Sequence, residues 1–221
     1  MVWEQVIRDD FSEGSEVPFV SISAAHFLFN AAFARQAELN PALHVSVHID
    51  STRRTIGFEF YTEERPNSFN LTPHHNRGLV SAARGVIGKH KWIEAVTKEK
   101  TKHRRFPPKK EAGKWVIQLC PAFEEHRARE SADIPSDHRG IYRYRRESGE
   151  IVYIGRGPIK DRLQLPERKD WDFDAIEYSL VGDPDEQVKW EDFWIERFKE
   201  ENRGELPFYN KVSGSSKYRE G

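Results

Sequence analysis

Gly140-Ile-Tyr-Arg-Tyr-Arg-Arg-Glu-Ser-Gly-Glu-Ile-Val-Tyr-Ile-Gly155 contains two strand-like runs around the turn signal Ser148-Gly149, and so predicts a β-hairpin. Because successive side chains of a strand alternate between faces, a four-residue loop would set Tyr142 opposite Tyr153. A two-residue loop would set Tyr144 opposite Tyr153, with Tyr142 still on that face. Either register places two phenols side by side on a short sheet. Cross-strand packing is the alternative explanation of these tyrosines, and the preferred one for Tyr144.

A long helix is predicted downstream of the hairpin, with one acidic residue on its apolar face. Asp183-Pro184-Asp185-Glu186 is typical of a helix start, with an Asp cap and Pro at the first helical position. The helix should run to about residue 201, and Gly204 should end it. Glu191 shares its face with Val188, Ile195 and Phe198. An inward carboxylate needs a partner, which could be a metal ion or, in a structural role, an arginine.

A short helix is predicted just after the hairpin. Pro158 can start this helix, and Pro166 disfavours helical geometry in the residue before it. Arg162 on this helix can then point toward the tyrosine face, where its planar fork is suited to a phosphate group. The alternative is an ordinary surface arginine. Two nearby cations are further candidates for contact with a nucleic-acid phosphate: Arg156 and Lys160.

The two tripeptides, Arg162, Glu191 and Asn210 together resemble the GIY-YIG nuclease family in order and spacing. The resemblance covers residues 139–213, about a third of the chain. It implies an α+β domain with a small three-stranded antiparallel sheet flanked by helices, and residues 172–180 are expected to form its third strand. Some restriction enzymes of the family carry a His one helical turn after the Arg. This chain has Pro166 there, so the role of that His is either absent or met by another group, such as Lys160.

The resemblance also implies a reaction, the metal-dependent hydrolysis of a phosphodiester that leaves a 5′ phosphate and a 3′ hydroxyl. One Mg²⁺ or Mn²⁺ ion would be bound by Glu191, and Arg162 would bind the scissile phosphate. Tyr142 would orient or deprotonate the attacking water, with Tyr153 assisting. A phenol has a free pKa of about 10, so a base role would need a lowered pKa. Asn210 would organise the site by hydrogen bonds.

Several functions agree with this sequence. The first expectation is a DNA endonuclease of restriction or defence type that acts on double-stranded DNA, since the chain carries no zinc-finger pattern. A repair or recombination nuclease and an RNA-directed nuclease are alternatives within the class. An inactive nucleic-acid-binding module is the alternative outside it. A homodimer would suit the cutting of both strands, but nothing in the sequence determines the oligomeric state.

Length and composition limit the remaining possibilities. The 221 residues are enough for one large or two small domains, and the formal net charge of −1 means that a nucleic-acid surface must be local. The single cysteine, Cys120, excludes a disulfide within one chain and is expected to be buried. No apolar stretch reaches the roughly 20 residues that a membrane span needs. The N-terminal residues lack a secretory pattern, so a cytoplasmic location is expected.

The first half of the chain, residues 1–125, is expected to form a separate α+β domain of unrecognised family, joined to residues 139–221 by a polar linker at 126–138. A helix capped by Ser23 is expected at 23–39. Further expected elements are paired strands at 43–49 and 55–61, a helix at 79–96 that is broken or bent near Gly85 and Gly88, and a strand at 115–119.

A basic segment in this first half is a second candidate for nucleic-acid contact. Residues 84–114 hold eleven Lys or Arg and three Glu, a net charge of +8. Pro107 and Pro108 prevent a single helix there, so a basic loop is expected. Such a loop suits phosphate-backbone binding, although a solvated loop is the alternative. The candidate residues of this segment are Lys102, Arg104, Arg105, Lys109 and Lys110.

Overall fold

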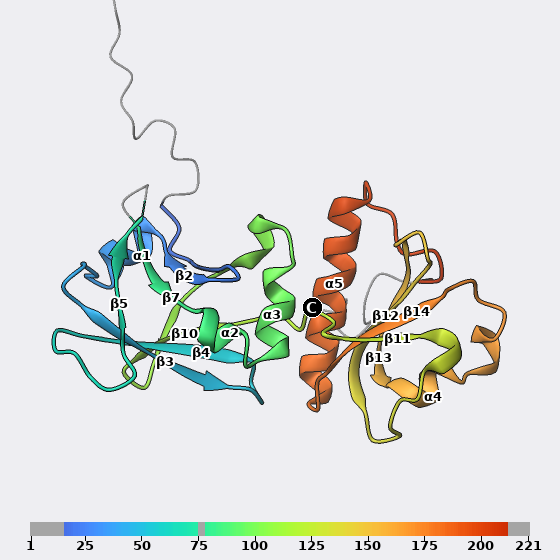
Figure 1. Ribbon diagram of the computed structural model, residues 1–221. Coiled ribbons are helices and arrows are strands. Elements are labelled where there is room, and N and C mark those ends of the chain that lie inside the picture. Colours follow the sequence, from blue (N-terminus) through green and yellow to red (C-terminus); the bar gives the residue numbers. More distant parts are fainter. Residues whose placement is uncertain (1–15, 75–77, 212–221) are drawn as a thin grey trace, which may run out of the picture. The chain divides into compact units, whose positions relative to one another are not determined.

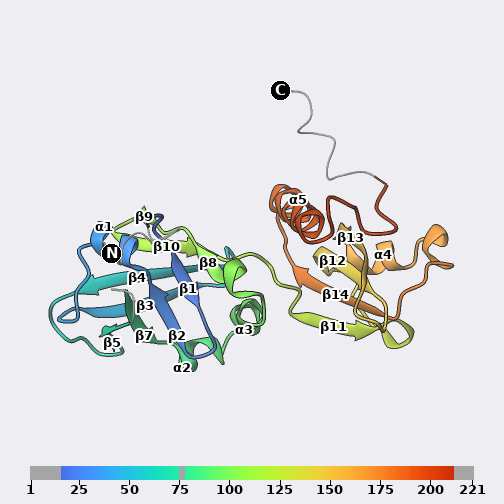
Figure 2. The ribbon, with the colours of Figure 1, turned by 90° about the horizontal axis from the view of Figure 1, so that it is seen from above.

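The computed structural model describes residues 16–74 and 78–211, which belong to two compact units. The first unit is Met1–Leu119 and the second is Cys120–Gly221. Both combine helices with antiparallel sheets, so the chain is α+β as expected (Figures 1 and 2). None of the described helices is both long and apolar enough to cross a bilayer.

The first unit contains two five-stranded antiparallel sheets. One sheet has the order β6-β7-β2-β1-β8, formed by Thr72–Pro73, Leu79–Ala82, His26–Phe29, Val20–Ile22 and Arg105–Phe106. The other has the order β5-β3-β4-β10-β9, formed by Phe69–Asn70, His44–Asp50, Thr55–Tyr61, Lys114–Gln118 and Lys109–Glu111. Phe27 and Phe29 of the first sheet pack edge to face on Phe58 of the second, each at 5.2 Å between ring centroids. These rings are fully buried, so the two sheets share a core.

The helix expected at residues 23–39 is wrong. The segment contains the turn after β1, strand β2 and the short helix α1 (Ala31–Gln36). Asn30 caps α1 by accepting a hydrogen bond from the Phe33 amide at 3.0 Å, whereas Ser23 accepts one from the His26 amide within a turn. Phe27 and Phe29 alternate with exposed or half-buried residues, so the strand periodicity decides the local structure.

The broken or bent helix expected at residues 79–96 is wrong at its start, where residues 79–82 form β7, but α2 (Arg84–Ile87) and α3 (Lys91–Thr97) follow and are separated at Gly88, as expected. Residues 79–82 pair with β2, and this pairing outweighs the helical pattern. The paired strands expected at 43–49 and 55–61 are confirmed as β3 and β4, and the strand expected at 115–119 as β10.

The second unit contains a sheet of four antiparallel strands, in the order β11-β14-β12-β13. The strands are Glu125–Ala128, Ala175–Leu180, Arg139–Arg145 and Ile151–Pro158. The unit also contains α4 (Ile159–Leu163), the 3₁₀ turns η3 (Arg129–Ser131) and η4 (Pro166–Arg168), and the long helix α5 (Pro184–Glu201). Cys120 at its start is buried, as expected.

Two expectations for this unit need correction. Its sheet has four strands and not three, because β11 pairs with β14 along the edge away from the hairpin. The segment expected to be the linker 126–138 contains most of β11 and all of η3, and the units divide between residues 119 and 120. Most residues of β11 are exposed because it is an edge strand. Its polar composition therefore resembles that of a linker, which is why the strand was not predicted.

The hairpin of β12 and β13 adopts one of the two expected registers. Tyr144 lies opposite Tyr153, and Tyr142 lies opposite Gly155. A register shift next to Tyr144 adds one residue to β13, and Gly149 has the positive φ of 88° that the turn requires. Tyr142, Tyr144 and Tyr153 therefore share one face of the sheet, as predicted.

The start of α5 agrees with the sequence pattern. The Asp183 carboxylate accepts hydrogen bonds from the amides of Asp185 and Glu186, both at 2.9 Å. We expect Asp183→Ala to lower the unfolding free energy of the second unit by about 1 kcal/mol, because two helical amides lose their acceptor. Urea unfolding followed by the amide signals of α5 would measure this. Asp185→Ala is the control, and an equal loss in both variants would contradict a capping role.

Candidate active site

The phenol cluster consists of Tyr142, Tyr144 and Tyr153, which stand together on β12 and β13. Their ring centroids lie 5.4 to 6.0 Å apart. Tyr142 and Tyr144 are fully buried, whereas Tyr153 is partly exposed. Tyr144 also stacks on Phe173 at 4.2 Å, which agrees with the packing role expected for it.

The hydroxyl groups of Tyr142 and Tyr153 converge over the bare backbone of Gly155. A Cβ atom on Gly155 would lie 2.9 Å from each hydroxyl oxygen and 2.6 Å from Cε1 of Tyr153. These separations are too short for any side chain, so residue 155 must be glycine if the phenols are to keep their places. The last residue of the second tripeptide thus makes room for the phenols of both tripeptides.

Arg168, which was not among the residues predicted from the sequence, completes the phenol cluster. Its Nη1 donates to the hydroxyls of Tyr142 and Tyr144, both at 2.9 Å, and its Nη2 donates to that of Tyr153 at 3.1 Å. The side chain comes from η4 and is buried. Arg168 stands in the polar run Pro166-Glu-Arg-Lys-Asp170, where nothing distinguishes it from a surface arginine.

Burial decides the acidity of two of these phenols. Desolvation raises the pKa of Tyr142 well above its ordinary value, although the charge of Arg168 acts in the opposite direction. The same cause raises the pKa of Tyr144 to about 12. Both groups are therefore protonated at neutral pH and can donate a hydrogen bond. A role for Tyr142 as general base would need a lowered pKa, so the orienting role is favoured.

Glu191 lies on α5, where it faces the sheet as predicted. Its carboxylate accepts a hydrogen bond from Nε of Arg156 at 2.8 Å, and its side chain is 15% exposed. Burial raises the pKa of Glu191, while the charges of Arg156 and Arg162 lower it and that of Asp192 raises it further. The partner of Glu191 in the structure is thus an arginine, the second of the two partners expected for this carboxylate.

Two cations beside the hairpin complete the surroundings of Glu191. Arg162 on α4 is exposed, and its Nε lies 3.5 Å from the position that a Cβ on Gly157 would take. Its charge also acts on Glu191. Lys160 on the same helix is half-buried. Arg162 and Arg156 together form an acid–arginine cluster with Glu191.

Asn210 holds the outer edge of β13. Its Oδ1 accepts from the Ile154 amide at 3.0 Å, and its Nδ2 donates to the Ile154 carbonyl at 2.9 Å. Since β13 is an edge strand, these two backbone groups have no neighbouring strand to pair with. Asn210 therefore acts through hydrogen bonds to the backbone between Tyr153 and Gly155, as the sequence analysis expected.

The five predicted residues surround β13 without forming one contact cluster. Tyr142 and Tyr153 belong to the phenol cluster on one face of the sheet. Arg156, the partner of Glu191, projects from the other face, because it is three residues from Tyr153 along the strand. A metal-binding group of three or more His, Cys, Asp or Glu is absent from the described residues. Mg²⁺ commonly uses one or two carboxylates with waters and substrate phosphates, and Glu191, the predicted ligand, is held by Arg156 in this structure.

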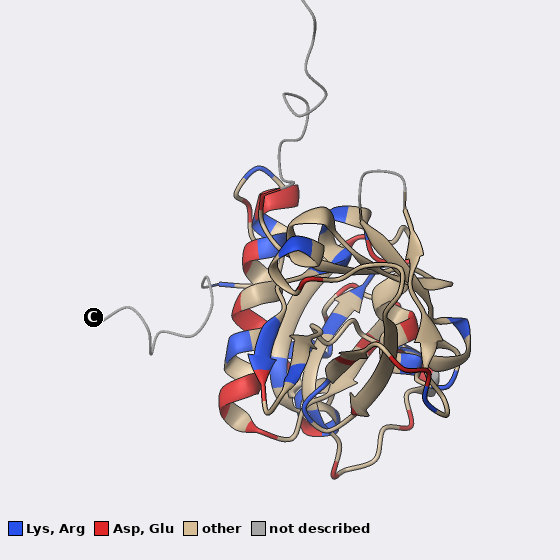
Figure 3. Cartoon of the chain, turned by 90° about the vertical axis from the view of Figure 1, so that its left-hand side faces the viewer, with Lys and Arg blue, Asp and Glu red and all other residues tan. Residues whose placement is uncertain are grey.

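The basic residues of the first unit that were predicted to contact nucleic acid differ in exposure and in the contacts that they already make. Arg104 donates to the Thr97 carbonyl at 3.2 Å and to the Thr101 hydroxyl at 3.0 Å, so it holds the end of α3. Arg105 lies over the Phe19 ring at 4.9 Å, and Lys110 over Trp115 at 5.9 Å. The exposed candidates of this set are Lys102, Arg105, Lys109 and Lys110. Figure 3 shows Lys and Arg interspersed with Asp and Glu on the side drawn.

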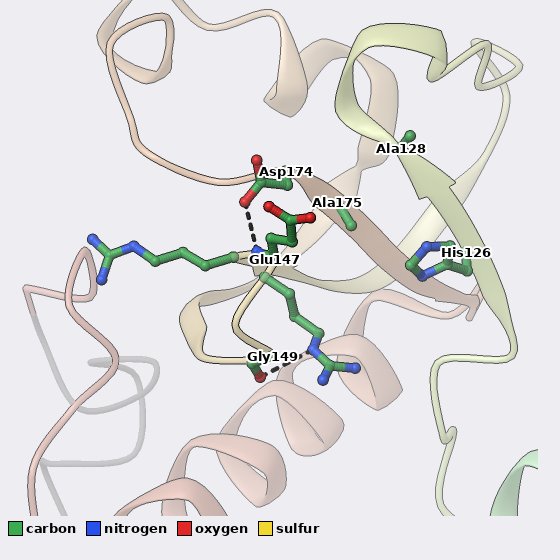
Figure 4. Close-up of a pocket in the computed structure, with 8 residues that line it drawn as sticks. His126, Ala128, Glu147, Gly149, Asp174 and Ala175 are labelled. Atoms are coloured by element: carbon green, nitrogen blue, oxygen red, sulfur yellow. Dashed lines mark hydrogen bonds between the residues drawn. The ribbon is translucent and has the colours of Figure 1, made fainter.

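A pocket of about 360 Å³ lies at the turn end of the hairpin (Figure 4). Its wall includes Asp174, whose carboxylate accepts from the Glu147 amide at 2.6 Å, and Arg145, which donates to the Gly149 carbonyl. Arg145 also forms an ion pair with Glu177 at 2.8 Å. These charged groups bind one another, and none of the predicted site residues lines the pocket.

A scan against protein-family models finds no match to this chain, and searches of curated proteins and of solved structures find none either.

Proposed function

We propose that the protein is a metal-dependent endonuclease whose second unit is a GIY-YIG-like nuclease domain. The observation that carries the proposal is the convergence of the Tyr142 and Tyr153 hydroxyls over Gly155. Tyr153 is partly exposed, so its hydroxyl can donate to an oxygen of a phosphodiester or of the attacking water, with the buried Tyr142 hydroxyl beside it. The arginine that directly follows on α4, Arg162, is exposed and suited to the same phosphate.

Each residue has a separate task in this reaction. Glu191, which pairs with Arg156 on the face opposite the phenols, would hold the Mg²⁺ or Mn²⁺ ion, and the ion would supply charge neutralisation to a phosphate bound at the edge strand β13. Arg162, with Lys160 near it, holds the scissile phosphate, and the guanidinium becomes more important as negative charge grows in the transition state. Tyr142 and Tyr153 act together as the hydrogen-bonding pair that orients the attacking water. Asn210 keeps β13 in place, and water attack leaves a 5′ phosphate and a 3′ hydroxyl.

Double-stranded DNA is the proposed substrate, cut in a restriction or defence role. Exposed cations of the first unit, above all Lys102 and Lys109, would hold the phosphate backbone, so binding should weaken steeply with salt. Two copies acting as a homodimer would cut both strands. Repair of DNA and cleavage of RNA are alternatives that use the same site residues.

A nucleic-acid-binding module without turnover is the second candidate. Two observations favour it: the phenols already accept hydrogen bonds from Arg168, and Glu191 is already paired with Arg156. A nuclease has to release Arg156 from Glu191 before a metal can bind, whereas a binding module can keep the pair.

Cleavage of supercoiled plasmid in Mg²⁺, in Mn²⁺ and in EDTA tests the proposed function, with RNA of matched sequence in parallel. Nicked or linear product that needs the metal would support the nuclease, and discrete fragments would support a restriction role. Product from RNA but not from DNA would mean that the substrate of the nuclease is RNA. Binding without product in every metal would contradict the nuclease and leave the binding module.

Gly155→Ala should reduce the cleavage rate by about 100-fold, because its methyl group displaces the hydroxyls of Tyr142 and Tyr153 from their common point. The obstacles are the ends of side chains, so the fold should survive. Initial rates of plasmid nicking would measure the effect, with circular dichroism to verify the fold. Gly182→Ala, where a Cβ meets nothing within 4 Å, is the control. A folded Gly155→Ala protein with the wild-type rate would exclude the phenols from the reaction.

A further inference from the structure

Arg168 is a buried cation without an acidic partner among the described residues. Its side chain is 5% exposed, and its hydrogen bonds all go to phenol oxygens. Aromatic rings surround the guanidinium, with the ring centroids of Tyr153 and Trp171 at 4.6 and 5.1 Å. Cation–π attraction and three hydrogen bonds thus offset the cost of burying its charge. A salt bridge would have neutralised this charge, whereas the phenol cluster leaves Arg168 with its full positive charge.

The direction of hydrogen bonding follows from the chemistry of the two groups. A guanidinium only donates, so each of the three phenol oxygens must accept from Arg168. The hydrogen of each hydroxyl then has to point elsewhere. In the described part of the chain, no protein acceptor receives a hydrogen bond from Tyr142, Tyr144 or Tyr153. Each hydroxyl therefore keeps a hydrogen that no described protein group accepts, and of the three side chains only that of Tyr153 is partly exposed.

The backbone around Arg168 is held in place by a second arginine. Arg129 donates to the carbonyls of Trp171 and Lys169, at 2.5 and 2.7 Å. Trp171 stacks on Tyr209 at 4.3 Å, and the Tyr209 hydroxyl accepts from the Asp172 amide at 2.8 Å. The segment from η4 to residue 173 is therefore ordered before any ligand binds, and Arg168 is preorganised.

We propose that Arg168 is a positioning residue that, with the buried Tyr142 beside it, sets the partly exposed Tyr153 as a hydrogen-bond donor to an oxygen of a phosphodiester substrate. The inference rests on the proposed function, because it needs the substrate oxygen that Tyr153 would meet. Arg168 itself does not touch the substrate, since the phenol rings enclose it. It acts through the phenols by fixing their oxygen positions and the directions of their hydrogens.

Substitution of Arg168 separates positioning from general support of the fold. In Arg168→Met we expect kcat for plasmid nicking to fall about 100-fold with KM for DNA little changed, because the phenols lose their common donor. Arg168→Lys keeps the charge but not the planar fork, so it should recover part of kcat. The exposed neighbour variant Lys169→Met is the matched control. If both Arg168 variants lose kcat only in proportion to their folded fraction, the positioning role is excluded.

A readout without turnover distinguishes this inference from the proposed function. Proteins labelled with ¹³C at the tyrosine Cζ atoms report the hydrogen bonding of each phenol. We expect the signals of Tyr142, Tyr144 and Tyr153 to shift in Arg168→Met, while that of Tyr61, in the first unit, stays constant. Unchanged phenol signals would overturn the inference even if the wild type cuts DNA. Shifted signals in a protein that cuts no nucleic acid would reject the proposed function. The substrate part of the inference would then be rejected as well, and only the hydrogen bonding of Arg168 to the phenols would stand.

Discussion

Gly140→Ala should unfold the second unit. A Cβ on Gly140 would lie 1.9 Å from the Ser179 carbonyl oxygen and 2.8 Å from the Val181 amide nitrogen. Both obstacles belong to the backbone at the end of β14, so no side-chain rotation can relieve the overlap. The central strand β12 would have to separate from β14 where Gly140 pairs with Leu180. We expect a loss of more than about 4 kcal/mol, which only severe backbone or core disruption produces.

The measurement is an amide NMR spectrum of the full chain, read separately for the two units. A loss of that size approaches the whole stability of a typical domain, about 5 to 15 kcal/mol, so the signals of residues 120–211 should collapse. Gly182→Ala is the control, because a Cβ there meets nothing within 4 Å, and it should stay within about 0.5 kcal/mol of wild type. A wild-type-like spectrum for Gly140→Ala would show that β12 and β14 do not approach as closely as the structure has them.

Local patterns explain why the hairpin and α5 could be predicted from sequence. The turn at Ser148-Gly149 and the alternation of Tyr142 and Tyr144 are contained in one short segment, and the cap of Asp183 before Pro184 is contained in another. The same is true of β3 and β4, which alternate clearly and are neighbours in the chain. In each case the residues that determine the structure lie within a few positions of one another.

Elements determined by distant residues could not be predicted. β11 has no pattern of its own and is a strand only because β14 offers it an unpaired edge. The segment 79–96 reads as helical, but pairing with β2 makes its first residues a strand. Arg168 is the functional counterpart: its burial depends on Arg129 and Tyr209, each about 40 residues away. No short window of sequence contains that information.

Glu191→Gln should reduce metal-dependent cleavage by about 1,000-fold, because the amide is a poor ligand and the metal contributes several kcal/mol of charge stabilisation. The same change should leave the protein at least as stable as wild type at pH 7. These two outcomes together distinguish a metal ligand from a structural ion pair, which loss of activity alone cannot do.

The stability expectation follows from the sign of the pKa shift. Burial raises the pKa of Glu191 above its ordinary value, so the folded protein binds the proton more tightly than the unfolded chain does. The resulting stabilisation is present at low pH and is lost as the pH rises through the folded-state pKa. At pH 7 the wild type therefore carries the cost of a buried charge. Glutamine avoids this cost, and its oxygen can still accept from Arg156.

Urea unfolding at pH 7 and at pH 4, beside plasmid nicking in Mg²⁺, measures both outcomes. The advantage of Glu191→Gln should be present at pH 7 and should shrink toward pH 4, as the wild-type carboxyl becomes protonated. Glu196→Gln, on the same helix but 60% exposed, is the matched control and should change neither quantity. A marked loss of stability at pH 7 would mean that the pair with Arg156 supports the fold. Loss of cleavage with stability retained would mean that the buried carboxylate is kept for the metal, and that the protein gives up stability to hold it.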